Sequence, residues 1–214
     1  MLSNELFAKV DQSLINYVEK EILPLYDSFD TAHQRPHAHA VIEESMRLAS
    51  FYNVNFNMVY AIAAYHDTGL LIDRELHHLY SGERIRSDKH LLEWFTEEEI
   101  ETIAEAAEDH RASNKEEPRS IYGMIVADAD KELQPINCIR RTVQYTESHF
   151  PHLSAEEKFE RSASHLKEKY ATNGYMHLWL KESLEAPFLT ELRAIINDEQ
   201  RLKQTIFQLM KENQ

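Results

Sequence analysis

Ala63-Ala64-Tyr65-His66-Asp67-Thr68-Gly69 is an apolar run that ends in an adjacent histidine and aspartate. The run predicts the buried last turn of a helix, which Gly69 would end. His66 and Asp67 would then lie at the inner end of that helix, where an imidazole and a carboxylate are costly unless something pairs with them. A divalent metal ion binds both groups. A hydrogen-bonded histidine at a capped helix end explains the isolated pair more simply, because so short a motif often occurs by accident.

The composition limits the classes of fold and partner. The chain has 214 residues, enough for one large domain or two small ones. Only four glycines and six prolines are present, which disfavours an all-β fold with its many tight turns. The formal net charge of −14 argues against duplex nucleic acid as a partner, although a small phosphorylated ligand could still bind at a local basic spot.

Cysteine content and hydropathy indicate the compartment. Cys138 is the only cysteine, so we expect neither a disulfide framework nor a cysteine-based zinc site. Residues 1–10 lack the apolar core of a signal peptide. The longest uncharged apolar run, residues 58–65, is far too short to span a bilayer. We therefore expect a cytoplasmic protein without membrane association. Its oligomeric state stays open, and a homo-oligomer is possible.

Helical periodicity covers most of the chain, and no strand pair is evident. Capping boxes start at Thr96 and Ser154, and Asn173-Gly174 ends a helix. We expect helices from residue 6 to just before Pro24 and over roughly 36–49, 57–67, 73–86, 97–109, 120–133, 154–170, 176–185 and 189–210. No linker rich in proline, glycine or serine divides them. The chain is therefore predicted to be one all-α domain over residues 1–214.

Other residues with metal-ligand chemistry lie on apolar helices rather than on solvated faces. His37 precedes the apolar pair Val41-Ile42 by one helical turn, and His110 ends the apolar helix over residues 97–109. Asp128 and Asp130 lie in the apolar segment 120–133, where a carboxylate needs a partner. On a helix they point about 200° apart, so we expect at most one of them to bind a given ion.

These motifs together resemble the HD superfamily of metal-dependent phosphohydrolases. The resemblance rests on Pro36-His37-Ala38-His39-Ala40-Val41, Ala64-Tyr65-His66-Asp67-Thr68-Gly69 and Val126-Ala127-Asp128-Ala129-Asp130-Lys131. It covers about residues 25–135 and implies an HD-type helical bundle, with C-terminal helices over about 136–214 packed on it as an extension. It also implies that His37, His66, Asp67 and Asp130 bind one divalent ion. His39 and Asp128 fit the family pattern less well.

Some members of this family hold a second ion through two further histidines. The sequence His77-His78-Leu79-Tyr80-Ser81-Gly82 resembles one of these positions, and His77 fits it better than His78 because small residues follow four and five positions later. The second position, often a His-His pair, is Asp109-His110 here. The resemblance thus implies His77 and His110 as ligands of a second ion, with Asp67 shared between the two ions. The alternative is a one-metal site with both histidines beside it.

The resemblance implies hydrolysis of a small phosphomonoester or phosphodiester, with nucleotides among the candidates, by metal-activated water. The metal could be manganese, iron, cobalt, nickel, zinc or magnesium. Asp67 is a candidate catalytic residue, and Arg111 is the candidate for both catalysis and phosphate contact. Lys131 is a second substrate-binding candidate, and Lys115 and Arg119 are weaker ones. A di-iron oxygenase and a non-catalytic nucleotide-sensing module are the alternative functions.

Overall fold

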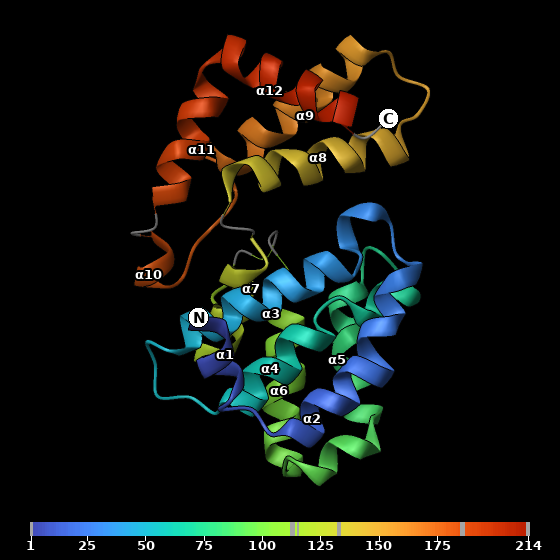
Figure 1. Cartoon of the computed structure of the whole chain (residues 1–214), viewed down its shortest axis with the longest axis vertical. Helices are drawn as coiled ribbons and strands as arrows, with labels where there is room; N and C mark the ends of the chain where they lie inside the picture. Colours follow the sequence, from blue (N-terminus) through green and yellow to red (C-terminus); the bar gives the residue numbers. More distant parts are fainter. Residues whose placement is uncertain (1, 112–113, 115, 132–133, 185–186, 213–214) are drawn as a thin grey trace. The chain divides into compact units, whose positions relative to one another are not determined.

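A computed structural model of the chain describes residues 2–111, 114, 116–131, 134–184 and 187–212. No β-strand occurs among these residues, so the predicted all-α fold is confirmed. They divide into two compact units, Met1–Phe29 with His33–Lys131 and Asp30–Ala32 with Glu132–Gln214. Figure 1 labels the helices of both units. The expectation of one domain over residues 1–214 stays a prediction.

The first unit holds the two sequence motifs around His37 and His66. Its α-helices are α1 (Leu2–Phe7), α2 (Gln12–Tyr17), α3 (Arg35–Ala49), α4 (Phe56–Tyr65), α5 (His77–Ser87), α6 (Glu97–Asp109) and α7 (Ile121–Ala129). A π-helical turn (Val18–Ile22) and 3₁₀ turns at Leu23–Ser28, Thr68–Leu71 and Lys89–Glu93 join or extend them. A further 3₁₀ turn, Thr31–His33, has residues in both units.

Helix α4 is the centre of the first unit (Figure 1). Its residues 58–65 are all buried, and it packs against α3, α6 and α7. This explains the apolar run that precedes His66, because a helix surrounded by other helices has no polar face. The Asn55 side chain accepts a hydrogen bond from the Asn57 N–H and starts the helix. His66 therefore emerges from the middle of the core.

The second unit has its own hydrophobic core. It comprises α8 (Pro135–His149), α9 (Ala155–Tyr170), the short α10 (Lys181–Leu184), α11 (Pro187–Asn197) and α12 (Glu199–Glu212). Leu166, Leu192 and Ile206 are fully buried where α9, α11 and α12 meet. The predicted capping box at Ser154 is confirmed, as is the one at Thr96 before α6.

Three helix boundaries differ from the predictions, each at an aspartate. Asp11 accepts the Ser13 N–H and starts α2 anew, so the predicted first helix is broken. Asp73 accepts the Leu76 N–H, and α5 begins only at residue 77. Asp198 accepts the Arg201 N–H and separates α11 from α12. A short carboxylate that bonds to nearby backbone competes with the helix, and periodicity does not detect this.

The predicted helix over 176–185 is also shorter, because residues 176–180 are not helical. Residue 185 lies outside the described part of the chain, as do residues 132 and 133 at the end of the predicted helix 120–133. None of the helices among the described residues combines the length and the apolar character needed to cross a membrane.

Candidate metal centre

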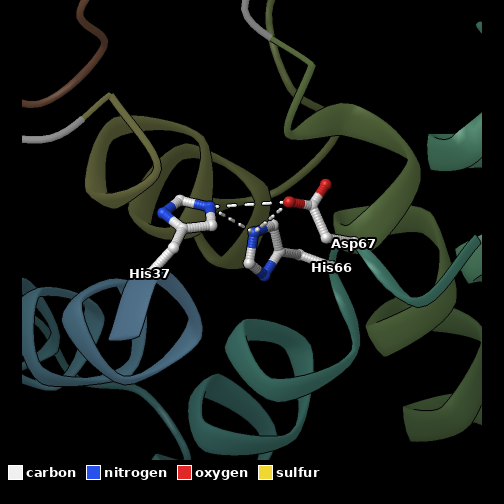
Figure 2. Close-up of side chains that lie close together, drawn as sticks. All are labelled: His37, His66 and Asp67. Carbon is white, nitrogen blue, oxygen red and sulfur yellow. Dashed lines mark hydrogen bonds and ion pairs between the residues drawn. The ribbon is translucent and has the colours of Figure 1, made fainter. Parts of the chain in front are cut away.

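His37, His66 and Asp67 converge from two helices of the first unit (Figure 2). His37 lies in the first turn of α3, and His66 is the residue that caps the C-terminus of α4. All three side chains are buried. His37 Nε2 lies 3.3 Å from His66 Nε2, and Asp67 Oδ2 lies 3.5 Å and 3.3 Å from these two nitrogens. Three donor atoms thus surround one point.

Asp130 joins the same group from the C-terminus of α7. Its Oδ1 lies 3.1 Å from His37 Nε2 and 3.8 Å from His66 Nε2. Asp128 is turned elsewhere, since its Oδ1 pairs with Lys131 Nζ at 3.2 Å in the interior. The geometry therefore favours Asp130 over Asp128 as the fourth donor. The Lys131 ammonium thus pairs with the buried carboxylate of Asp128. Contact between Lys131 and a substrate stays a prediction.

A second group of donors forms on the other side of Asp67. His77, the first residue of α5, and His110, which caps α6, approach each other with their Nε2 atoms 3.2 Å apart. Asp67 Oδ1 lies 3.5 Å from each of them. One oxygen of Asp67 faces each group, so this carboxylate is the only member common to both among the described residues.

Three of the four histidines have the tautomer that a metal ligand requires. Each uses Nδ1 to bond the carbonyl oxygen three residues earlier: His66 to Ala63 at 2.7 Å, His77 to Arg74 at 2.8 Å and His110 to Ala107 at 2.5 Å. A carbonyl only accepts, so Nδ1 carries the proton and the Nε2 lone pair is directed toward the cluster.

The surroundings of the cluster favour a cation. The C-terminal ends of α4, α6 and α7 all point at it, and each end carries a partial negative charge. Burial opposes ionisation of Asp67, yet its contacts with His66, His110 and His37 hold the pKa of that carboxyl well below its usual range. Burial lowers the pKa of His77 to about 4, so its imidazole is neutral and able to bind metal at pH 7.

The donor spacing provides a test of whether a metal ion fits. Two atoms bound to one ion at about 2.1 Å lie about 3.0–3.4 Å apart in octahedral or tetrahedral geometry. Of the eight separations given above, four are 3.1–3.3 Å and lie in this range, and the other four are 3.5–3.8 Å and lie slightly above it. Imidazole and carboxylate are also the donors that manganese, iron, cobalt, nickel and zinc accept. The residues therefore fit one divalent ion per group.

Tyr26 and Ser81 support the dyad and were not predicted as part of the site. The Tyr26 hydroxyl, fully buried, donates to the Ala64 carbonyl and accepts the Asp67 N–H at 3.3 Å. Ser81 on α5 donates to the His66 carbonyl at 2.7 Å and accepts the Gly69 N–H at 2.9 Å. A tyrosine in an apolar run and a helical serine carry no sequence signal for such a role.

Gly69 serves a different purpose from the predicted helix end. α4 ends four residues earlier, and a Cβ at Gly69 would lie 2.0 Å from the His77 carbonyl oxygen. The absence of a side chain therefore lets the turn after the dyad approach the start of α5. This contact brings His77 to the dyad.

The remaining predicted residues lie around the second group. Arg111 follows His110 directly and is half-buried. Burial lowers the pKa of His78, and the charges of His110 and Arg111 lower it further. His78 is close to His77 in sequence but is not among the clustered donors, and His39 on α3 is exposed. Arg119 is held in ion pairs with Glu105, Glu108 and Asp109. Lys115 lies outside the described residues.

Comparison with known proteins gives one finding. A family model described as HD domain matches residues 37–133, which include all six clustered donors. Neither the curated proteins nor the solved structures contain a match to the chain.

Proposed function

Residues 37–133 belong to the HD superfamily, and on this premise we propose that the protein is a metal-dependent phosphohydrolase that acts on a small phosphomonoester or phosphodiester, with nucleotides as the first class to test. HD domains are generally metal-dependent hydrolases. One observation carries the proposal: the two carboxylate oxygens of Asp67 face two separate groups of histidine Nε2 atoms.

His37, His66, Asp67 Oδ2 and Asp130 would hold the first divalent ion. His77, His110 and Asp67 Oδ1 would hold a second. Such ions, when bound, lower the pKa of water and polarise a phosphoryl oxygen.

The chain's own residues supply orientation and charge. The hydrogen bonds from Nδ1 of His66, His77 and His110 to the backbone fix their rings, so their Nε2 atoms need no rearrangement on binding. Arg111 is the proposed contact for the phosphate oxygens, because a guanidinium binds them in pairs and this residue directly follows His110. Asp67 would contribute one carboxylate oxygen to each ion, which is its proposed catalytic role.

The test combines metal analysis with a substrate panel. We expect the purified protein to retain divalent metal and to release phosphate from phosphomonoesters, nucleotides or cyclic dinucleotides. Asp67→Ala should remove both properties while leaving the helix content unchanged. His39→Ala is the matched control, since it removes an exposed histidine two residues from His37 on the same helix.

Three results would contradict the proposal. Unchanged metal stoichiometry in Asp67→Ala would exclude the assigned centre. Oxygen consumption by the iron-loaded protein without phosphate release would favour the di-iron oxygenase, and tight nucleotide binding without turnover would favour a sensing module.

A further inference from the structure

Helices α5 and α6 are joined by a set of ion pairs beside the second group of donors. Glu108 on α6 accepts from two arginines with different oxygens: its Oε1 from Arg86 Nη1 on α5 at 2.5 Å and its Oε2 from Arg119 Nη2 at 2.7 Å. Arg86 also binds Glu101 through two further hydrogen bonds. Glu108 on α6 thus connects Arg86 on α5 with Arg119, which lies two residues before the start of α7. We call Arg86, Glu108 and Arg119 the α5–α6 clamp.

The two helices are in close contact at this clamp. A Cβ at Gly82 on α5 would lie 2.5 Å from Glu108 Oε1 and 2.8 Å from its Cγ, so the Glu108 side chain occupies the space left by the glycine. Gly82 is five residues after His77, and Glu108 is two residues before His110. The contact therefore lies about one turn from the two histidines whose Nε2 atoms are 3.2 Å apart.

Arg119 also binds the carboxylate of Asp109, the residue directly before His110. The Arg119 N–H donates to Asp109 Oδ2 at 2.8 Å, and its Nε donates to Asp109 Oδ1 at 3.0 Å. Its Nη2 reaches the Glu105 carbonyl oxygen at 2.9 Å. Asp109 is thus turned toward Arg119, and the last turn of α6 is held at three positions, 105, 108 and 109, that lie on one face of the helix.

We propose that the α5–α6 clamp positions His77 and His110 for the second ion, and that Glu108 and Arg119 are positioning residues that set the affinity for this ion alone. The inference rests on the proposed two-metal centre, but only on its metal binding and not on hydrolysis. The first ion depends on α3, α4 and α7, which do not contribute residues to the clamp.

The physical reason is preorganisation. The two histidines sit at opposite ends of their helices, at the start of α5 and the end of α6, so a small slide or rotation of one helix changes the distance between their Nε2 atoms. Glutamine at position 108 keeps the volume but offers one acceptor oxygen instead of two, so it cannot serve both arginines. Residues that orient metal ligands from outside the coordination sphere typically contribute 10- to 100-fold to metal affinity.

Two variants of opposite charge change separate positioning from long-range electrostatics. Glu108→Gln removes a negative charge and Arg119→Met removes a positive one. Simple attraction between charges predicts weaker cation binding in the first variant and tighter binding in the second. The clamp predicts weaker binding of the second ion in both.

The experiment is a calorimetric titration of the metal-free full chain with Mn²⁺. We expect two ions for the wild type, and in both variants an affinity for the second ion reduced by about tenfold or more, with the first unchanged. Unchanged first-ion binding also shows that each variant is folded. Glu44→Gln and Arg47→Met are matched controls, because this pair on α3 has similar side-chain exposure (19% and 41%, against 14% and 44% for Glu108 and Arg119).

Four results would overturn the inference. These are no change in either variant, an equal loss of both ions, opposite effects of the two variants, or a wild type that binds a single ion. Absence of phosphohydrolase activity with normal two-ion binding would refute the proposed function and leave the clamp intact.

Discussion

The two donor groups that share Asp67 are built in different ways. The first takes its histidines and Asp130 from α3, α4 and α7, which pack on one another through apolar side chains. The second takes its histidines from α5 and α6, beside a set of exposed and half-exposed ion pairs. The His66 side chain is completely buried, whereas that of His77 is 15% exposed.

This difference indicates that the first site is maintained by the hydrophobic core and the second by polar contacts at its edge. Core packing resists change, because displacing a buried helix creates cavities and costs several kcal/mol, about 2–5 for one large side chain lost. Exposed ion pairs contribute about 1 kcal/mol or less each. The second site should therefore be the easier one to remove without unfolding the protein.

The largest effect is expected from Asp67→Asn, which tests whether the two groups are one centre. The amide keeps the volume but removes the charge that faces both groups, so both ions should be lost and activity should fall to background. Elemental analysis and phosphate release measure this. Retention of one ion would show that the two groups bind metal independently. Asp128→Asn is unsuitable as a control, because it would remove the buried carboxylate that pairs with Lys131.

His66→Ala and His77→Ala should separate the two groups. The first variant removes a ligand of the core-built site and should abolish metal content and activity. The second should leave one ion per chain and reduce activity strongly without removing the first ion. Metal-to-protein ratios measured after dialysis distinguish these outcomes, and equal ratios in the two variants would refute the proposed asymmetry. His90→Ala, at an exposed histidine of the same unit, serves as the control.

Tyr26→Phe tests how far the first group depends on its support. The change leaves the buried Asp67 N–H without its hydroxyl acceptor, and an unsatisfied buried group of this kind costs about 1–3 kcal/mol. We expect a lower free energy of unfolding and weaker binding of the first ion. Urea denaturation and Mn²⁺ titration measure these two quantities. Tyr60→Phe, at another buried tyrosine of the same unit, should change neither appreciably.

The smallest effect concerns the pH dependence of the clamp. Burial opposes ionisation of Glu108, but its hydrogen bonds from Arg86 and Arg119 outweigh this and lower the pKa of its carboxyl from 4.5. Stabilisation by a lowered pKa is complete above the unfolded-state value and is lost as the pH falls through the folded-state value. The wild type should therefore exceed Glu108→Gln in stability at pH 7, by about 1 kcal/mol or less, and lose this advantage progressively as the pH falls below 4.5. Urea denaturation in chelator at pH 7 and pH 3.5 checks this.

The sequence predicted three of the helices that surround the site close to their observed bounds. Strong apolar periodicity and capping boxes determine α3, α4 and α6, and each forms at the expected place. The breaks at Asp11 and Asp198 were missed because a side-chain hydrogen bond to local backbone overrides a continuing apolar pattern. Residues 176–180 have a helix-compatible composition but lie in an irregular segment.

The donor residues of the candidate site could be predicted from the sequence, but the residues that hold them in place could not. The resemblance to the HD superfamily implied these six histidines and aspartates, and the structure brings all six together. Their roles as metal ligands stay predictions. Ser81 and the α5–α6 clamp depend on how two helices pack, which no local pattern encodes. The same applies to the choice between Asp128 and Asp130, which depends on the partner that each side chain meets.

Tyr26 lies eleven positions before the first residue that the family model matches. A gene fragment cut at residue 37 would keep all six donor side chains and yet expose the backbone of Asp67 to water where the tyrosine hydroxyl now covers it. The segment that the family model matches is therefore smaller than the unit that has to be expressed, transplanted or recombined as a whole. Protein engineering on this scaffold should treat residues 23–28 as part of the domain.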